Sequence, residues 1–272
     1  LNFGEYRIFL IKKYKILFTI KKILIIILFV LFVCCAIFML NGYIEKGVVK
    51  SELDSFRKRG IFIETTNIQG QTVDIYKVNK KYDYEDLSAP VFDYSLNSKH
   101  YIGSKTDIIL TTRNPLRKVN TAIVRDVAGY FSENFFIGHA TINIEDDGSK
   151  IIESVGNDED FSGVRIKEND WIYTEVRYGN DAQIIVALRL KNIDDETKEN
   201  ICTNLKELEG KKYNYLLPFY LKNKYYCTDL ISRTLKKENI KINYDSFYTT
   251  GNDIIVSNNT YVIFLCERIE EG

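Results

Sequence analysis

The chain reads Phe-Phe-Ile-Gly-His-Ala-Thr-Ile-Asn-Ile from residue 135 to 144, then Lys-Ile-Ile-Glu-Ser-Val-Gly from 150 to 156. Both runs are rich in residues that favour strands, and the Asp-Gly pair between them is a strong hairpin signal. The sequence therefore predicts two antiparallel strands. Such a hairpin would bring His139 of the first strand beside Glu153 of the second.

The same patterns predict an α+β fold, with an antiparallel sheet packed on helices. A hairpin is expected at Ile61 to Thr65 and Thr72 to Val78, with further strands at Ile108 to Thr111, Phe136 to Ile144, Ile151 to Val155, Val164 to Ile166, Tyr173 to Tyr178, Ile184 to Leu190, Asp253 to Val256 and Thr260 to Cys266, the last two as edge strands. Helices are expected at Asn120 to Asn134, with Ile123, Val127 and Phe131 on one face, from an N-cap at Asp194 to Glu209, and from Cys227 onward.

An apolar segment near the N-terminus predicts one membrane helix. Residues 23–40 contain no charge and no proline, and about 20 apolar residues span a hydrocarbon core. Six basic residues and one acidic residue precede it, which favours a cytoplasmic N-terminus and an extracytoplasmic remainder. A cleaved signal is the rival reading, but its apolar region would be shorter and would end in a small-residue cleavage site.

Charge and cysteine content narrow the class of protein. The zero net charge conceals an acidic remainder, because residues 41–272 hold 31 of the 37 basic and 36 of the 37 acidic side chains. That balance argues against a nucleic-acid partner. Cys202, Cys227 and Cys266 are the thiols after the apolar segment. They are too few for a disulfide scaffold, and Cys202 and Cys266 are expected to be buried, inert thiols, with a bridge between them as the alternative.

Cys227 and His139 have the residue types of a nucleophile and its base. A thiol attacks as the thiolate, which a helix N-terminus and a nearby imidazole both favour. Glu153 would orient the ring, and the backbone N–H of Cys227 would contribute to an oxyanion hole. Taken singly, each residue is more often structural. Their order and spacing together favour the catalytic interpretation.

Other chemistry lacks support in the sequence. It contains no Gly-rich phosphate loop, Cys-x-x-Cys pair or His-Glu-x-x-His motif, so neither a cofactor nor a metal is expected. Acidic runs at 145–147 and 158–160 are more typical of solvated turns than of calcium loops. His100 is expected to be solvated in a polar loop. Trp171, Tyr173 and Tyr178 are assigned to the core in preference to a groove.

Several motifs in order resemble the circularly permuted, YiiX-type branch of the NlpC-like papain-fold hydrolases, over about residues 105–265. They are Thr-Asp-Ile-Ile-Leu-Thr (106–111), Gly-His-Ala-Thr-Ile (138–142), Ile-Ile-Glu-Ser (151–154), Gly-Val (163–164), Gly-Lys-Lys-Tyr-Asn-Tyr (210–215) and Tyr-Cys-Thr-Asp-Leu-Ile (226–231). The resemblance implies a permuted papain-like fold.

Carried over residue by residue, the resemblance implies Cys227 as nucleophile, His139 as base, Glu153 as orienting acid and Tyr213 on the oxyanion side. This sequence departs from the family pattern in having Thr106 in place of Gly, Asn214 where Asp is common, and Thr228-Asp229 in place of Ser-Glu. These departures leave the three catalytic positions intact. They make the substrate pocket harder to infer.

The predicted organisation has four parts: a basic N-terminus (1–22), a transmembrane helix (23–40), a stalk and linker with a hairpin (41–104) and a catalytic domain (105–272). The predicted function is a membrane-anchored, extracytoplasmic cysteine amidase or peptidase that acts on cell-wall peptides or related amides. Two alternatives remain. One is a lipid acyltransferase or thioesterase that uses the same cysteine, and the other is a non-catalytic envelope interaction module.

Overall fold

The computed structural model describes residues 3–92, 100–115, 120–158, 161–177, 184–216, 219–243 and 248–269, with only the backbone of residues 3–12, 38, 157 and 158. The chain divides into two compact units, Leu1–Ile44 and Glu45–Gly272. Helix α1 (Phe3–Arg59) begins in the first and ends in the second. Its N-terminal half includes one stretch that is apolar and long enough to cross a membrane.

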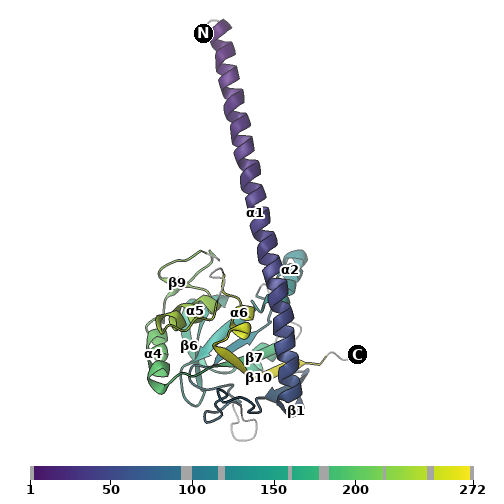
Figure 1. Cartoon of the computed structure of the whole chain (residues 1–272), viewed down its shortest axis with the longest axis vertical. Helices are drawn as coiled ribbons and strands as arrows, with labels where there is room; N and C mark the ends of the chain where they lie inside the picture. Colours follow the sequence, from purple (N-terminus) through teal and green to yellow (C-terminus); the bar gives the residue numbers. More distant parts are fainter. Residues whose placement is uncertain are drawn as a thin grey trace. The chain divides into compact units, whose positions relative to one another are not determined.

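Eight strands form one antiparallel sheet among the described residues of the second unit (Figure 1). Their order is β1-β2-β10-β7-β3-β4-β5-β6, where β1 is Ile61–Ile68, β2 Gln71–Lys77, β3 Ile108–Thr111, β4 His139–Asn143, β5 Lys150–Asp158, β6 Phe161–Glu168, β7 Ile184–Leu190 and β10 Thr260–Arg268. A separate parallel pair joins β8 (Lys212–Tyr213) to β9 (Lys224–Tyr225). The α+β class and the antiparallel sheet are thus confirmed.

Five shorter helices lie in the described part of the same unit: α2 (Ala122–Phe135), α3 (Trp171–Arg177), α4 (Asp195–Lys206), α5 (Cys227–Lys237) and α6 (Gly251–Val256). Helix α5 packs against β4 and β5, and α4 packs against α5 (Figure 1). The predicted N-cap is confirmed, because the Asp194 side chain accepts a hydrogen bond from the Thr197 N–H. The predicted hairpin turn is also present, with Gly148 at a φ of +69°.

Three strand predictions were wrong. The segment from Tyr173 belongs to helix α3, and Tyr178 lies outside the described residues. The segment from Asp253 is helix α6, which begins with a reciprocal capping box between Thr250 and Asp253. Strand β10 is central, because it pairs with both β2 and β7. Its side chains from Tyr261 to Cys266 are buried without alternation, as expected for a strand covered on both faces.

The structure also differs from the expected stalk and linker. Val49, Leu53 and Phe56 of α1 are buried in the core of the second unit. Strand β2 joins the main sheet through β10, so the β1–β2 hairpin extends that sheet. The part of the chain from Glu45 onward therefore belongs to the same compact unit as the strands that carry His139 and Glu153.

Candidate active site

Strands β4 and β5 place His139 beside Glu153. Thr141 pairs with Glu153 in the register of these strands, and His139 lies two residues before Thr141 on the same face. The two side chains are therefore diagonal neighbours, within reach of long side chains. His139 Nε2 lies 2.9 Å from Glu153 Oε2, and both residues are buried, with 6% and 2% of their surface exposed.

The second oxygen of Glu153 is held by Arg165 of β6. Glu153 and Arg165 are directly paired across β5 and β6, and Arg165 Nε donates a hydrogen bond of 2.8 Å to Glu153 Oε1. Burial alone would raise the pKa of Glu153, but the hydrogen bond and charge of His139, aided by Lys167 and Arg165, lower it from 4.5 to about 2. Glu153 is consequently an ionised carboxylate with each oxygen assigned to a different partner.

Cys227 is the first residue of α5, and its thiol is near enough to the His139 ring to affect the pKa of that ring. Because Nε2 of the ring faces Glu153, Nδ1 is the nitrogen left for the thiol. Burial alone would lower the pKa of His139, but the hydrogen bonds and charges of Cys227 and Glu153 raise it from 6.5 to about 9. The ring thus holds its proton at neutral pH.

The start of α5 offers unpaired donors at the same place. The first N–H groups of a helix have no partner within it, and the N-cap residue, Tyr226, makes no side-chain capping bond within the part of the chain that the structure describes. The strand that carries Glu153 positions this turn, since Ser154 Oγ donates a 2.7 Å hydrogen bond to the Tyr225 carbonyl oxygen. The backbone N–H of Cys227 is therefore suited to bind an oxyanion formed beside its own sulfur.

Tyr213 lies within electrostatic range of Cys227. Its ring packs against Gly156 of β5, where an added Cβ would lie 2.9 Å from the Tyr213 ring. Burial, together with the negative charge of Cys227, raises the pKa of Tyr213, so its hydroxyl stays protonated at neutral pH. A neutral O–H near the thiolate is a further hydrogen-bond donor. The structure brings all four predicted residues together, while their roles remain predictions.

Trp171 is a contact of the site that the sequence patterns did not indicate. It is buried in the core, as expected, but its ring also stacks on His139, with ring centres 5.4 Å apart and planes at 21°. An aromatic ring on this face restricts the imidazole and excludes water from it. Nothing in the spacing of a lone tryptophan, 32 positions after the histidine, predicts this contact.

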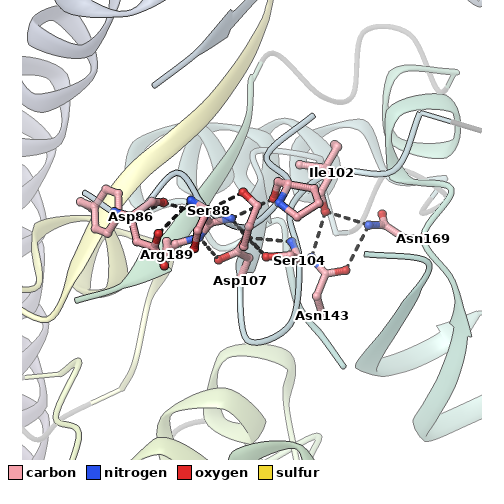
Figure 2. Close-up of polar contacts among 11 residues, drawn as sticks. Asp86, Ser88, Ile102, Ser104, Asp107, Asn143, Asn169 and Arg189 are labelled. Carbon is pink, nitrogen blue, oxygen red and sulfur yellow. Dashed lines mark hydrogen bonds and ion pairs between the residues drawn. The ribbon is translucent and has the colours of Figure 1, made fainter. Parts of the chain in front are cut away.

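A second buried polar cluster accounts for the Thr-Asp-Ile-Ile motif (Figure 2). Arg189 of β7 donates to both oxygens of Asp107, from Nε at 2.9 Å and from Nη2 at 2.8 Å. The same guanidinium donates to the carbonyl oxygens of Asp86 and Pro90. Asp107 therefore ties the segment before β3 to β7, and its role is structural.

This cluster continues to the strand that carries the histidine. Asn143, at the far end of β4 from His139, donates to the Ile102 carbonyl oxygen at 2.9 Å. Asn169 donates to the same oxygen at 2.8 Å and to Asn143 Oδ1 at 3.1 Å (Figure 2). Since Asn169 lies two residues before the first residue of α3, the cluster sets the positions of both β4 and the helix that begins with Trp171.

The acidic runs were expected to be turns. Among the described residues no group of three or more His, Cys, Asp or Glu side chains is placed to hold a metal ion. Glu145 and Asp146 pair with lysines, and Asp147 accepts from the Ser149 N–H in the turn. The side chains of the run 158–160 lie outside the described set.

Cys202 and Cys266 are free, buried thiols, and burial raises their pKa values to about 11 and about 12. His100 is not solvated, because it is partly buried against Phe92 and Tyr173.

Comparison with protein-family models and with curated proteins gives no match for this chain. Any assignment of function therefore depends on the chemistry of these side chains.

Proposed function

We propose that this protein is a membrane-anchored cysteine hydrolase that cleaves amide bonds through an acyl-enzyme intermediate. One observation carries the proposal: His139 Nε2 lies 2.9 Å from the Glu153 carboxylate, and the same ring interacts with Cys227 at the start of α5. Nucleophile, base and orienting acid in this relation define the Cys-His-acid arrangement.

The first half of the reaction forms a thioester. The Cys227 thiolate attacks the carbonyl carbon of the substrate, and the resulting oxyanion accepts hydrogen bonds from the N–H of Cys227 and from the Tyr213 hydroxyl. The C–N bond then breaks as the His139 imidazolium gives its proton to the leaving amine. Glu153 keeps the ring aligned and stabilises its positive charge.

The second half releases the acid. Neutral His139 takes a proton from a water molecule as that water attacks the thioester carbonyl. The C–S bond breaks, the thiolate leaves with its negative charge, and the imidazolium is restored beside it. The carboxylic acid product departs.

The proposed fold is the permuted papain-like one. Its support is the chain order, with the histidine on β4, the acid on β5 and the nucleophile later, at the start of a helix that packs on those two strands. This order agrees with the succession of motifs on which the resemblance depends.

The proposed location is outside the cytoplasmic membrane, and the proposed substrates are cell-wall peptides or related amides. The candidate span near the N-terminus follows a segment with six basic residues and one acidic residue. Such an excess of positive charge favours retention of that segment in the cytoplasm. The substrate class follows from this location together with the resemblance.

The test is capture of the intermediate on the full chain in nanodiscs. Incubation with peptidoglycan fragments and rapid acid quenching should give an acyl adduct on the Cys227 peptide, seen by mass spectrometry, and free amine in solution. Cys227→Ala should give neither. Cys202→Ala, which removes a buried thiol remote from the site, is the matched control and should behave like the native protein.

A second candidate function is acyl transfer from lipids, and one observation favours it. Tyr215, Leu216, Phe219 and Tyr220, between β8 and β9, expose large apolar side chains. The Tyr215 ring lies 4.9 Å from that of Tyr213, so an acyl chain bound there would end near the sulfur. A fatty-acyl adduct on Cys227 from phospholipid, with none from peptidoglycan fragments, would select this function. No adduct from either, with slow alkylation of Cys227, would indicate a non-catalytic module.

A further inference from the structure

Helix α2 exposes its apolar face. Ile123 and Val127 keep 76% and 51% of their surface exposed, and Val124 and Tyr130 are exposed as well. These positions recur at helical spacing, so they form one stripe. The sequence predicts that Ile123 and Val127 share a face, but that face does not pack on the domain.

The domain instead contacts the other side of α2 and its last turn, where Ser132, Asn134 and Phe135 are buried. Ser132 is fully buried and its hydroxyl donates to the Thr112 carbonyl oxygen at 2.7 Å. Asn114 Nδ2 donates to the Arg125 carbonyl oxygen at 2.8 Å, and an added Cβ on Gly129 would lie 3.1 Å from Asn114. Surface helices of globular proteins have the reverse orientation. The apolar stripe is therefore available to a partner outside the chain.

The chain itself places α2 within reach of a bilayer. Lys46, the second residue of the compact unit, donates from Nζ to Oδ1 of Asn134 near the C-terminal end of α2. Lys46 follows Leu40, the end of the apolar segment, by six positions in the sequence. Six residues span at most about 20 Å by any path, and the 14 residues of α2 span about 21 Å. A bilayer that contains the apolar segment is thus accessible to the whole helix.

The composition of the stripe also fits a lipid surface. Three β-branched residues, Ile123, Val124 and Val127, provide an apolar face, and Tyr130 has the amphipathic ring that is enriched at membrane–water interfaces. Arg125 and Asp126 project from the helix and are exposed. An amphipathic helix of this kind lies in the interface plane with its apolar face among the acyl chains.

We propose that the face formed by Ile123, Val124, Val127 and Tyr130 lies in the lipid–water interface and holds the domain in a defined orientation on the bilayer. This docking is independent of catalysis. It adds a second membrane contact to the apolar segment of α1, and two attachments restrict the orientation of a domain more than one does.

The test is photo-crosslinking of the full chain in nanodiscs of phosphatidylethanolamine and phosphatidylglycerol. A diazirine amino acid replaces Val127 in one sample and the neighbouring Asp126 in another, and mass spectrometry identifies the adducts. Phospholipid adducts should be several-fold more frequent at position 127 than at 126. Equal lipid labelling at the two positions would overturn the proposal, and so would adducts at 127 with a second copy of the chain.

A charge on the stripe gives a second, independent readout. Val127→Asp should reduce lipid adducts from a probe at Ile123 several-fold, whereas Asp126→Asn should leave them unchanged. Both substitutions are at exposed positions, and the melting curve of Trp171 fluorescence verifies that the domain stays folded. Unchanged labelling at position 123 in a folded Val127→Asp chain would contradict docking of this face.

Discussion

Two buried carboxylates on one sheet, Asp107 and Glu153, contact cations in similar geometry and have different roles. Asp107 is fully buried and receives two hydrogen bonds from Arg189. Glu153 is nearly as buried and receives one hydrogen bond from Arg165 and one from His139. In both cases each carboxylate oxygen has its own hydrogen-bond partner.

The difference lies in the cation. The Arg189 guanidinium donates to Asp107, Ser104 and backbone carbonyl oxygens (Figure 2), and burial is outweighed by Asp107, which raises the pKa of Arg189 further. A guanidinium does not exchange its proton under such conditions. The His139 ring does, and Cys227 is among the groups that raise its pKa. A buried ion pair becomes chemically useful where its cation titrates and touches a nucleophile.

Removal of the nucleophile should have the largest effect on turnover with little effect on stability. Cys227→Ala should reduce turnover by at least about 10⁴-fold, because no other group in the site can form the acyl intermediate. The free energy of unfolding should change by only about 1 kcal/mol, since the side chain is small. Steady-state rates and urea unfolding followed by Trp171 fluorescence measure both. A large loss of stability with residual activity would assign Cys227 to the core instead.

The converse change is Arg189→Met, which leaves Asp107 buried without its cation. We expect a loss of about 3–5 kcal/mol in the free energy of unfolding. The double variant Asp107→Asn with Arg189→Met should recover part of that loss, because the stranded charge is gone. Urea unfolding curves that start from the folded variant measure this free energy. A neutral effect of Arg189→Met would show that the cluster does not organise the fold.

Glu153→Gln should have a smaller effect on the rate. The ring keeps a hydrogen-bond partner but loses the negative charge that stabilises imidazolium, so the rate should fall by about tenfold to hundredfold, below the full contribution of a general base, about 10²–10⁴. Asp107→Asn is the matched change at the structural cluster, and it should alter stability more than the rate constant of the folded enzyme. An unchanged rate for Glu153→Gln would reassign the orienting role.

The pH dependence of stability should be gradual, in two windows. The pKa of His139 is raised from 6.5 to about 9, so its stabilisation is complete below pH 6.5 and disappears as pH rises through 9. The pKa of Glu153 is lowered from 4.5 to about 2, so its contribution is complete above pH 4.5 and disappears as pH falls toward 2. Within each window, stability should change by up to about 1.4 kcal/mol per pH unit.

Cys227 helps to raise the pKa of His139, so a variant without the thiol is a control for the alkaline window. In Cys227→Ala the loss of stability on the alkaline side should be smaller and should end at lower pH, because His139 then lacks the partner that helps raise its pKa. The acid window of Glu153 should remain. Unfolding curves collected from pH 3 to 10 measure both. Identical alkaline profiles for the two proteins would mean that the thiol and the ring do not interact.

Local patterns were sufficient for the central hairpin and for three of the helices. The Asp-Gly turn predicted the pairing that brings His139 to Glu153, and Asp194 predicted the start of α4. Cys227 was correctly expected to begin a helix. Each of these depends on contacts within a few residues of the chain, for which sequence signals exist.

Two strand predictions misjudged local signals that the sequence contains. A short apolar run such as Asp253 to Val256 suits a strand or a helix equally, and only the capping box after Thr250 favours the helix. The continuous apolar run from Tyr261 to Cys266 was a missed signal for a central strand.

The contacts of Trp171 with His139 and of Arg165 with Glu153 depend on sheet register and on how α3 packs. Neither is encoded by local spacing. The candidate triad was therefore predictable as a set of residues, but the groups that support it were not.

The most direct test is the pH dependence of Cys227 alkylation by iodoacetamide in the native full chain and in His139→Ala, resolved by peptide mass spectrometry. In the native protein the rate should remain high and nearly flat down through neutral pH, because the imidazolium keeps the sulfur ionised. In His139→Ala it should fall at neutral pH and rise only as an ordinary thiol ionises. Superimposable profiles for the two proteins would contradict the thiolate–imidazolium pair.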